Sequence, residues 1–314
     1  MSTPLVSVIT VTYNSARYVV ESIESVLASS YTNFELIIGD DASTDSTWEL
    51  IESFEDSRIV RYRNEINLGE YPNRNKAISL AKGSYIIFID GDDLIYPHGL
   101  EFLVRMLHAF PSCAMALMTW FRNDIFFPVI LTPKQFYLGE YFGHGFLGTA
   151  FSNVLFRASV LKAEGGLSAT HKIGDDFIRY KIAAKYPSLL VNDGATWWRE
   201  TPGQASQVWG NSVMGVIESF QLKFEFLRLE TCPLTKEEKD LAAGNLFLSL
   251  TKIIIKSTLK GYFKRAYRLH SEFHIPLKYY FLVRRKPLKI NPLGGYSPVN
   301  PYRLPLSENP FVSK

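Results

Sequence analysis

The segment Asp90-Gly91-Asp92-Asp93 places three carboxylates within four residues, directly after the apolar run Tyr85–Ile89. Side chains alternate along a strand, so Asp90 and Asp92 are expected to share one side of the chain. Carboxylates this close raise one another's pKa unless a cation neutralises them, and Mg²⁺ and Mn²⁺ prefer oxygen ligands. The alternative is that the three acids only cap a turn and a helix over Leu94–Leu100.

Strand-like and helical patterns alternate through the first hundred residues. Strands are predicted for Leu5–Val11, Phe34–Gly39, Arg58–Tyr62 and Tyr85–Ile89, and helices for Arg17–Ala28, Ser46–Phe54 (with a capping box at Ser46–Glu49) and Asn73–Lys82. Strands joined by helices lie parallel, and their ligands bind beyond the carboxyl ends of the strands. The acids after Gly39 and after Ile89 should therefore meet at one edge of an α/β sheet.

Length and composition favour one large unit with an appendage. The chain has 314 residues, of which 46% are apolar. We predict a main domain over residues 1–206, with halves 1–99 and 100–206, and a helical, basic extension over 207–314 that ends in a Pro-rich tail. The two cysteines give no disulfide framework, which is typical of a reducing compartment, so a cytoplasmic location is expected.

The predicted extension is strongly basic. Between Lys252 and Lys289 there are 11 Lys or Arg residues and a single acid. Lys252, Lys256, Lys260 and Lys264 recur every four residues, which predicts one stripe along a helix beside apolar residues. This pattern is typical of a helix on an anionic membrane surface, and a solvated helix face is the alternative. No recognised motif supports a nucleic-acid partner, so none is expected.

The sequence contains neither a P-loop nor a glycine-rich dinucleotide turn after the first strand. Phosphates would therefore be held by a metal and side chains. A nucleotidyltransferase remains an alternative function, but such enzymes normally carry a glycine- and basic-rich turn there. Residues 11–15 contain no glycine and no lysine. A non-catalytic binding module is the second alternative, although this chain keeps the carboxylates that such a module would lose.

Several motifs occur together in an order that resembles the family 2 glycosyltransferases with the GT-A fold. They are Val6–Asn14, Asp40–Asp45, Asn67-Leu68-Gly69, Arg74-Asn75 and Asp90–Asp93, and the resemblance spans about residues 4–206. It implies a mixed, mainly parallel sheet with helices on both faces. It also implies inverting transfer of a sugar from a nucleotide-sugar donor, usually a UDP-sugar, to a glycan or lipid-linked glycan, with Mn²⁺ or Mg²⁺, in cell-surface polysaccharide biosynthesis.

The resemblance assigns roles to residues of the first half. Thr12 and Tyr13 would line the nucleotide base, and Asp41 would accept the uracil N3 proton. The alternative for Asp41 is ordinary turn and cap chemistry. Arg74 would approach the ribose or the diphosphate, and a solvated arginine on a helix is the alternative.

Two further roles concern the metal and the acceptor. Asp92 would bind the metal directly, and Asp90 would contact the ribose or orient the metal site. In the second half, Gly165-Gly166-Leu167 followed by Asp175 and Asp176 resembles a glycine pair and a Glu-Asp motif whose final Asp is the catalytic base, here Asp176. Asp175 stands where the family usually has Glu, and a helix N-cap is the alternative for this pair.

Arg199 lies in a segment that resembles a family motif and would stabilise the diphosphate. Thr201 stands where a His is common in that motif, so a histidine contribution is in doubt. The lipid-linked acceptor, together with the basic extension, suggests a peripheral position on the inner face of the plasma membrane.

Overall fold

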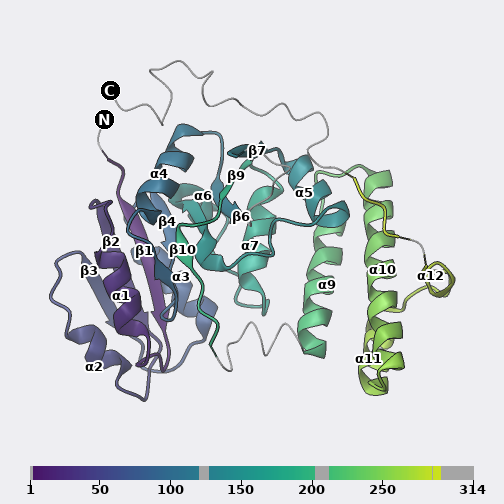
Figure 1. Cartoon of the computed structure of the whole chain (residues 1–314), viewed down its shortest axis with the longest axis horizontal. Helices are drawn as coiled ribbons and strands as arrows, with labels where there is room; N and C mark the ends of the chain where they lie inside the picture. The colour runs from purple at the N-terminus through teal and green to yellow at the C-terminus, as the bar shows by residue number, and fades with distance from the viewer. Residues whose placement is uncertain (1–2, 120–126, 202–211, 285, 291–314) are drawn as a thin grey trace.

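The computed structural model describes residues 3–119, 127–201, 212–284 and 286–290. In this part of the chain, one sheet has the strand order β3-β2-β1-β4-β8-β6-β9-β7 (Figure 1). Its strands are β1 (Val6–Thr12), β2 (Phe34–Asp40), β3 (Ile59–Arg63), β4 (Tyr85–Phe88), β6 (Met115–Thr119), β7 (Val129–Leu131), β8 (Val154–Arg157) and β9 (Ser188–Asn192). A separate antiparallel pair joins β5 (Leu94–Ile95) to β10 (Thr196–Trp197).

The sheet is mixed and mainly parallel, as predicted. Strands β1, β2, β3 and β4 run parallel to one another. Strand β8 is antiparallel to both β4 and β6, β9 is parallel to β6, and β7 is antiparallel to β9. The chain places β2 and β3 on one side of β1 and then returns to place β4 on the other side. The carboxyl ends of β1 and β4 therefore flank a topological switch point.

Helices cover both faces of the sheet, because alternate strand residues are apolar on both sides. In β4, Tyr85 and Ile87 belong to one apolar cluster, while Ile86 and Phe88 belong to the other. The first cluster packs under α1 (Val19–Leu27), α2 (Thr47–Glu52) and α4 (Gly99–Ala109), and the second under α3 (Glu70–Leu80), α5 (Pro133–Phe142), α6 (Ala158–Ala163) and α7 (Gly174–Ala183). A short 3₁₀ turn, η1 (Phe151–Asn153), precedes β8.

The C-terminal extension is helical, as predicted, and stands at the end of the molecule farthest from β3 (Figure 1). It consists, in the described residues, of α9 (Val213–Arg228), α10 (Lys236–Leu259), α11 (Phe263–Phe273) and α12 (Lys278–Phe281). Leu222 and Phe226 of α9 and Leu246 of α10 join the apolar cluster beneath α5 and α7. The predicted domain boundary at 206 and the Pro-rich tail lie outside the described residues.

No helix in the described ranges combines the length and the hydropathy needed to cross a membrane.

Three local predictions from the first hundred residues were wrong. Residues 94–95 form β5, and α4 begins only at Gly99, so no helix starts at Leu94. Ser46 makes no side-chain cap to α2; instead Asp45 accepts hydrogen bonds from the backbone and hydroxyl of Thr47. Helix α3 begins at Glu70 rather than near residue 73, because Pro72 is tolerated within a first helical turn.

The four lysines predicted on one helical stripe do not share one. Helix α10 ends at Leu259, and Gly261 turns the chain with a φ of +78° before α11 begins at Phe263. Lys252 and Lys256 therefore lie on α10, whereas Lys264 lies on α11. The four-residue spacing of the lysines continues through a turn, and Gly261 is the residue in the sequence that indicates this turn.

Asn75 and Gly166 provide a test of how α3 is fixed to the second half of the chain. Asn75 exchanges two hydrogen bonds with the backbone of Leu167, at 2.7 and 2.8 Å. Gly166 has a φ of +70°, and a Cβ there would lie 2.5 Å from Asn75 Oδ1. We expect Gly166→Ala to lower the free energy of unfolding by about 2–4 kcal/mol, from backbone strain plus loss of these bonds.

Gly165→Ala is the matched control, since Gly165 also has a positive φ, of +88°, but a Cβ there meets no atom within 4 Å. It should cost about 1–2 kcal/mol, from the backbone alone. Urea unfolding of both variants would measure the difference. Equal losses would show that the contact with Asn75 contributes nothing.

Candidate active site

The predicted residues from β1 and β4 meet at the switch point of the sheet. Thr12 is the last residue of β1, Tyr13 follows it, and Asp90 lies two residues beyond the end of β4. Strands β1 and β4 pair directly, and the backbone N–H of Ile89 donates to Ile9 O. The turns after the two strands are therefore neighbours, as expected for a ligand site in an open α/β sheet.

Asp41 is buried and orders the loop that follows β3. Its Oδ1 accepts hydrogen bonds from Asn64 Nδ2 and from the backbone N–H of Leu68, and its Oδ2 accepts one from the backbone of Gly69. The distances lie between 2.8 and 2.9 Å. These bonds explain why Asn67-Leu68-Gly69 accompanies an aspartate in the sequence. The carboxylate thus has a structural task in addition to the predicted contact with the base.

The turn after β1 is tied to the turn after β2. The backbone N–H of Asn14 donates to Ser43 Oγ at 2.9 Å, and Asn14 Oδ1 accepts from the backbone of Thr44 at 2.8 Å. Asn14 adopts a φ of +51°, which asparagine tolerates better than most residues. Tyr13 is 50% exposed beside this turn. Its ring is therefore open to a planar ligand, while the backbone beneath it is held firmly.

Arg74 is buried, so the alternative of a solvated arginine was wrong. Its Nη2 lies 2.6 Å from Asp90 Oδ1 and 3.0 Å from Glu70 Oε1. Its Nε and Nη1 are inaccessible to solvent and have no hydrogen-bond partner. The guanidinium packs against the rings of Phe88 and Phe151, at 5.5 and 5.1 Å from their centroids, so Arg74 places a buried positive charge beside Asp90.

Arg199 reaches the Asp92-Asp93 turn because β10 pairs with β5. Its backbone N–H donates to Asp93 Oδ1 at 3.1 Å, and its Nε donates to Asp92 O at 2.9 Å. Its Nη2 pairs with Glu21 Oε2 at 2.6 Å. The structure therefore brings Arg199 to the predicted turn, with part of its guanidinium engaged by Glu21.

Asp175 and Asp176 lie in the first turn of α7, where the helix dipole favours negative charge. The buried guanidinium of Arg179 holds both: Nη2 lies 2.6 Å from Asp176 Oδ1 and 3.1 Å from Asp175 Oδ2. Burial raises the pKa of Asp176 to about 7, and Asp175 adds to the rise. Arg179 opposes it. Asp176 can therefore take up a proton near neutral pH, as a general base must.

Phe151 links the two groups of carboxylates. The guanidinium of Arg74 lies 5.1 Å from the centroid of this ring, and that of Arg179 lies 5.7 Å from it. Tyr71 of α3 adds a second link, because its hydroxyl donates to Lys172 O at 3.0 Å, in the loop before α7. The arginine partners of Asp90 and Asp176 thus share one aromatic ring, although the two carboxylates are far apart in the sequence.

The charges around Asp92 bear on whether a metal ion fits the predicted site. Asp90 is neutralised by Arg74, whereas burial and the nearby Asp90 raise the pKa of Asp92. A cation at Asp92 would relieve this unfavourable charge. Among the described residues, no group of three His, Cys, Asp or Glu side chains could hold a metal ion. Asp92 therefore fits a divalent cation as a single carboxylate ligand, and the described residues do not form an all-protein metal cage.

Asp93 has a different task from its two neighbours. It is buried, and burial together with Asp90 raises its pKa to about 7. It accepts a hydrogen bond from the backbone N–H of Arg199, so it holds the residues that follow β10 in place.

The sequence analysis did not identify Phe151, Tyr71 or Arg179 as part of the site. For Arg179 a signal was present, because it follows Asp176 by three residues and Asp175 by four, which is contact spacing on a helix. Phe151 and Tyr71 carried no such signal. Their roles depend on contacts between residues far apart in the sequence, from Phe151 with Arg179 to Tyr71 with Lys172.

The sequence model that describes glycosyl transferase family 2 matches residues 7–163, which is half of the chain. A relative from Escherichia coli, the UDP-Glc:alpha-D-GlcNAc-diphosphoundecaprenol beta-1,3-glucosyltransferase WfaP, is 45% identical over 89 residues, 28% of this chain and 36% of that enzyme. Similar matches span about a third to a half of the length of the curated relatives.

Solved structures extend the likeness to most of the chain. TarS 1-349 of S. aureus in complex with UDP-GlcNAc covers 88% of this chain and 90% of its own, with a TM-score of 0.61 and 19% identity. The mannosyltransferase PcManGT of Pyrobaculum calidifontis in complex with GDP-Man and Mn²⁺ covers 90% and 84%, with a TM-score of 0.60 and 19% identity. The predicted GT-A fold is confirmed by these structures. By the family match, the chain belongs to glycosyl transferase family 2.

Proposed function

We propose that this protein transfers a sugar from a nucleotide-diphosphate donor to a hydroxyl of a glycan or lipid-linked glycan, with inversion at the anomeric carbon. The observation that carries the proposal is the arrangement around Phe151. Arg74, which pairs with Asp90 of the proposed donor site, and Arg179, which pairs with Asp176, both lie against this ring.

The donor base would bind at the turn after β1. Thr12 and Tyr13 offer backbone and an exposed ring, and Asp41 Oδ2, which accepts one hydrogen bond from Gly69, has a second lone pair that would accept the N3 proton of uracil. UDP is favoured because WfaP, which is 45% identical over the matched residues, is named as a UDP-Glc transferase.

The diphosphate would lie against Asp92 and Arg74. Asp92 would hold a Mn²⁺ or Mg²⁺ ion, and Asp90 would contact the ribose while keeping Arg74 in place. A cation bound there supplies positive charge that offsets the charge developing on the leaving diphosphate. The buried guanidinium of Arg74 would add positive charge behind Asp90, and Arg199 would add a further cation beside the Asp92-Asp93 turn.

Asp176 would remove the proton from the acceptor hydroxyl as its oxygen attacks the anomeric carbon. The attack comes from the face opposite the leaving diphosphate, so a single displacement inverts the anomeric centre without a covalent nucleophile on the protein. Arg179 fixes the orientation of the Asp176 carboxylate through the 2.6 Å contact.

The roles of Asp92 and Asp176 separate in binding experiments. We expect Asp92→Asn and Asp176→Asn each to lower transfer by about 10²–10⁴-fold, because each removes a group needed in the transition state. Only Asp92→Asn should abolish the stabilisation that Mn²⁺ adds to UDP binding. Thermal shift with UDP-, GDP-, dTDP- and CDP-sugars, with and without Mn²⁺, would measure binding. Full transfer by either variant would refute its assigned role, and binding without any transfer by the wild type would favour a non-catalytic module.

The pH dependence of transfer should report the raised pKa of Asp176. The base works only when ionised, so the rate should rise with pH and level off above about pH 7, falling about tenfold per unit below it. Asp175→Asn removes a negative neighbour that raises this pKa. The acidic limb of the pH–rate profile should therefore move to lower pH. Glu55→Gln, at an exposed acid after α2, is the control and should leave the limb in place. An acidic limb that does not shift in Asp175→Asn would contradict the assignment of Asp176 as the base.

We further propose that the enzyme works at the inner face of the plasma membrane and contacts it through the end of the helical extension. WfaP is named for an acceptor linked to diphosphoundecaprenol, a membrane lipid. The only cysteines of the chain, Cys113 and Cys232, are both free and buried, which suits a reducing compartment.

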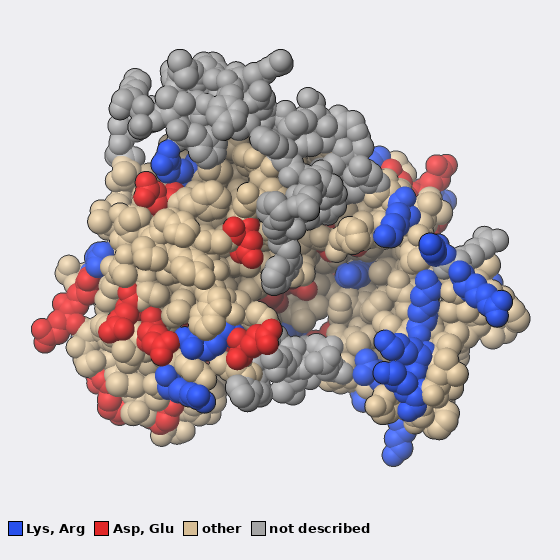
Figure 2. All heavy atoms as spheres, in the orientation of Figure 1, with Lys and Arg blue, Asp and Glu red and all other residues tan. Residues whose placement is uncertain are grey.

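The exposed end of the extension, residues 256–268 and 277–281, combines apolar and basic side chains, and we call it the basic–apolar end. Leu259, Phe263 and Tyr267 are 82%, 65% and 75% exposed, and Phe281 is 84% exposed. Exposed lysines and arginines stand among them, and Figure 2 shows these gathered over α10 and α11. Apolar side chains that enter the headgroup region, with cations beside them, fit an anionic bilayer. A second copy fits poorly, because its equally basic end would repel.

Vesicle binding tests this contact. The protein should bind phosphatidylcholine vesicles that contain phosphatidylglycerol and should bind pure phosphatidylcholine weakly, with loss at high salt. Phe263→Ser with Tyr267→Ser should weaken binding at least about tenfold, because two large apolar side chains no longer enter the bilayer. Leu80→Ser, at an exposed leucine of α3, is the control. Equal binding to both vesicles, or a mutation-sensitive dimer in place of vesicle binding, would refute the proposal.

A further inference from the structure

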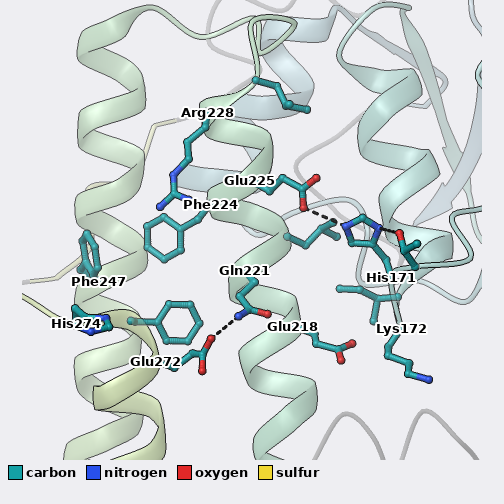
Figure 3. Close-up of a pocket in the computed structure, with 15 residues that line it drawn as sticks. His171, Lys172, Glu218, Gln221, Phe224, Glu225, Arg228, Phe247, Glu272 and His274 are labelled. Carbon is teal, nitrogen blue, oxygen red and sulfur yellow. Dashed lines mark hydrogen bonds and ion pairs between the residues drawn. The ribbon is translucent and has the colours of Figure 1, made fainter.

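A cavity of about 810 Å³ opens between the base loop and the helical extension (Figure 3). The base loop, residues 170–173, forms one wall, and side chains of α9, α10 and α11 form the others. The volume lies within the range of about 300–1,000 Å³ that small-ligand sites occupy. None of the residues to which we assigned the donor or the base lines this cavity.

The cavity begins next to the catalytic base. Ile173 lines it and is also the N-cap of α7, three residues before Asp176. His171 lines it as well, and its ring stacks on that of Phe177 at 4.3 Å, directly after Asp176. A ligand whose reacting hydroxyl reaches Asp176 would therefore have the cavity within reach of its next units.

Carboxyl and amide groups are distributed along the cavity. Gln221 Nε2 donates to Glu272 Oε1 at 2.6 Å, and His171 Nε2 lies 3.1 Å from Glu225 Oε2 (Figure 3). Glu218 Oε2 is inaccessible to solvent and has no hydrogen-bond partner. A buried acceptor of this kind indicates a missing donor, such as a ligand hydroxyl.

An aromatic wall faces these polar groups. Phe224 lies 5.0 Å from Phe247 and 5.9 Å from Phe273, measured between ring centroids. Apolar ring faces beside carboxylate and amide acceptors suit a pyranose, which has an apolar face and a rim of hydroxyl donors. Three carboxylates offset the cations Lys172 and Arg228, so the lining favours a neutral sugar over an anionic nucleotide. The polar groups equally disfavour a lipid chain.

We propose that this cavity binds the pyranose units of the acceptor glycan that lie behind the hydroxyl being glycosylated. The inference rests on the proposed transferase function and locates its acceptor in the extension, outside the segment that the family model covers. Glu218 accepts hydrogen bonds from the sugar hydroxyls, and Gln221 both accepts and donates them. The aromatic wall packs against the pyranose rings.

Saturation-transfer NMR with cellotriose, chitotriose and maltotriose tests the proposal on the full chain. The wild type should bind at least one of the three. Glu218→Ala and Gln221→Ala should each weaken that binding about tenfold, because each removes hydrogen bonds to the sugar. Both side chains lie at least partly at the surface, so the fold should persist, and the thermal midpoint would verify this. Glu230→Ala, at an exposed acid beyond α9 that does not line the cavity, is the matched control.

UDP binding in the presence of Mn²⁺ is measured in parallel and should be unchanged in every variant. Binding of no trisaccharide by the wild type, or binding that survives both substitutions, would overturn the assignment of the cavity. If the wild type then still binds UDP, only the assignment of the cavity to the acceptor glycan is refuted. If the wild type binds neither UDP nor a nucleotide sugar, the proposed function itself falls.

Discussion

The pairing of buried arginines with carboxylates is the interaction on which the site depends. Asp90 and Asp176 each have a nearly buried guanidinium at 2.6 Å, from Arg74 and Arg179 respectively. The guanidiniums are 3% and 2% exposed, so loss of a carboxylate partner would leave a buried positive charge without that ion pair. Both guanidiniums also lie against the ring of Phe151. The positions of two carboxylates from different halves of the chain are thereby linked through one aromatic side chain.

The sheet topology explains why these pairs form where they do. The parallel strands deliver the turns after β1 and β4 to the switch point, and the antiparallel strand β8 returns η1 and Phe151 to the same edge. The small β5–β10 pair then brings Arg199 beside the Asp92-Asp93 turn. In each case the backbone hydrogen bonds between paired strands fix the position of the adjoining turn, and the side chains of the site project from these turns.

The helical extension shares its apolar core with the second half of the sheet domain. Leu222 and Phe226 share the apolar cluster of α5 and α7, so α9 is fixed relative to the helix that carries Asp176. A rigid α9 gives the cavity beside the base loop a defined shape. The far end of the same extension leaves its apolar side chains in solvent, where burial in the fold would be the default. One set of helices therefore presents a polar cavity inward and an apolar, basic end outward.

The sequence by itself determined the order of strands and helices in the first half, the edge at which the acids gather, the family resemblance and the helical nature of the extension. Those features follow from local periodicity and from the general rule that parallel strands expose their carboxyl ends together. Tertiary structure alone decided that Arg74 is buried, that Phe151 and Tyr71 join the two halves, and that the lysine repeat breaks at Gly261. Contacts between residues far apart in the chain, and the course of a turn, depend on packing across the sheet, which leaves no periodic signal in a single sequence.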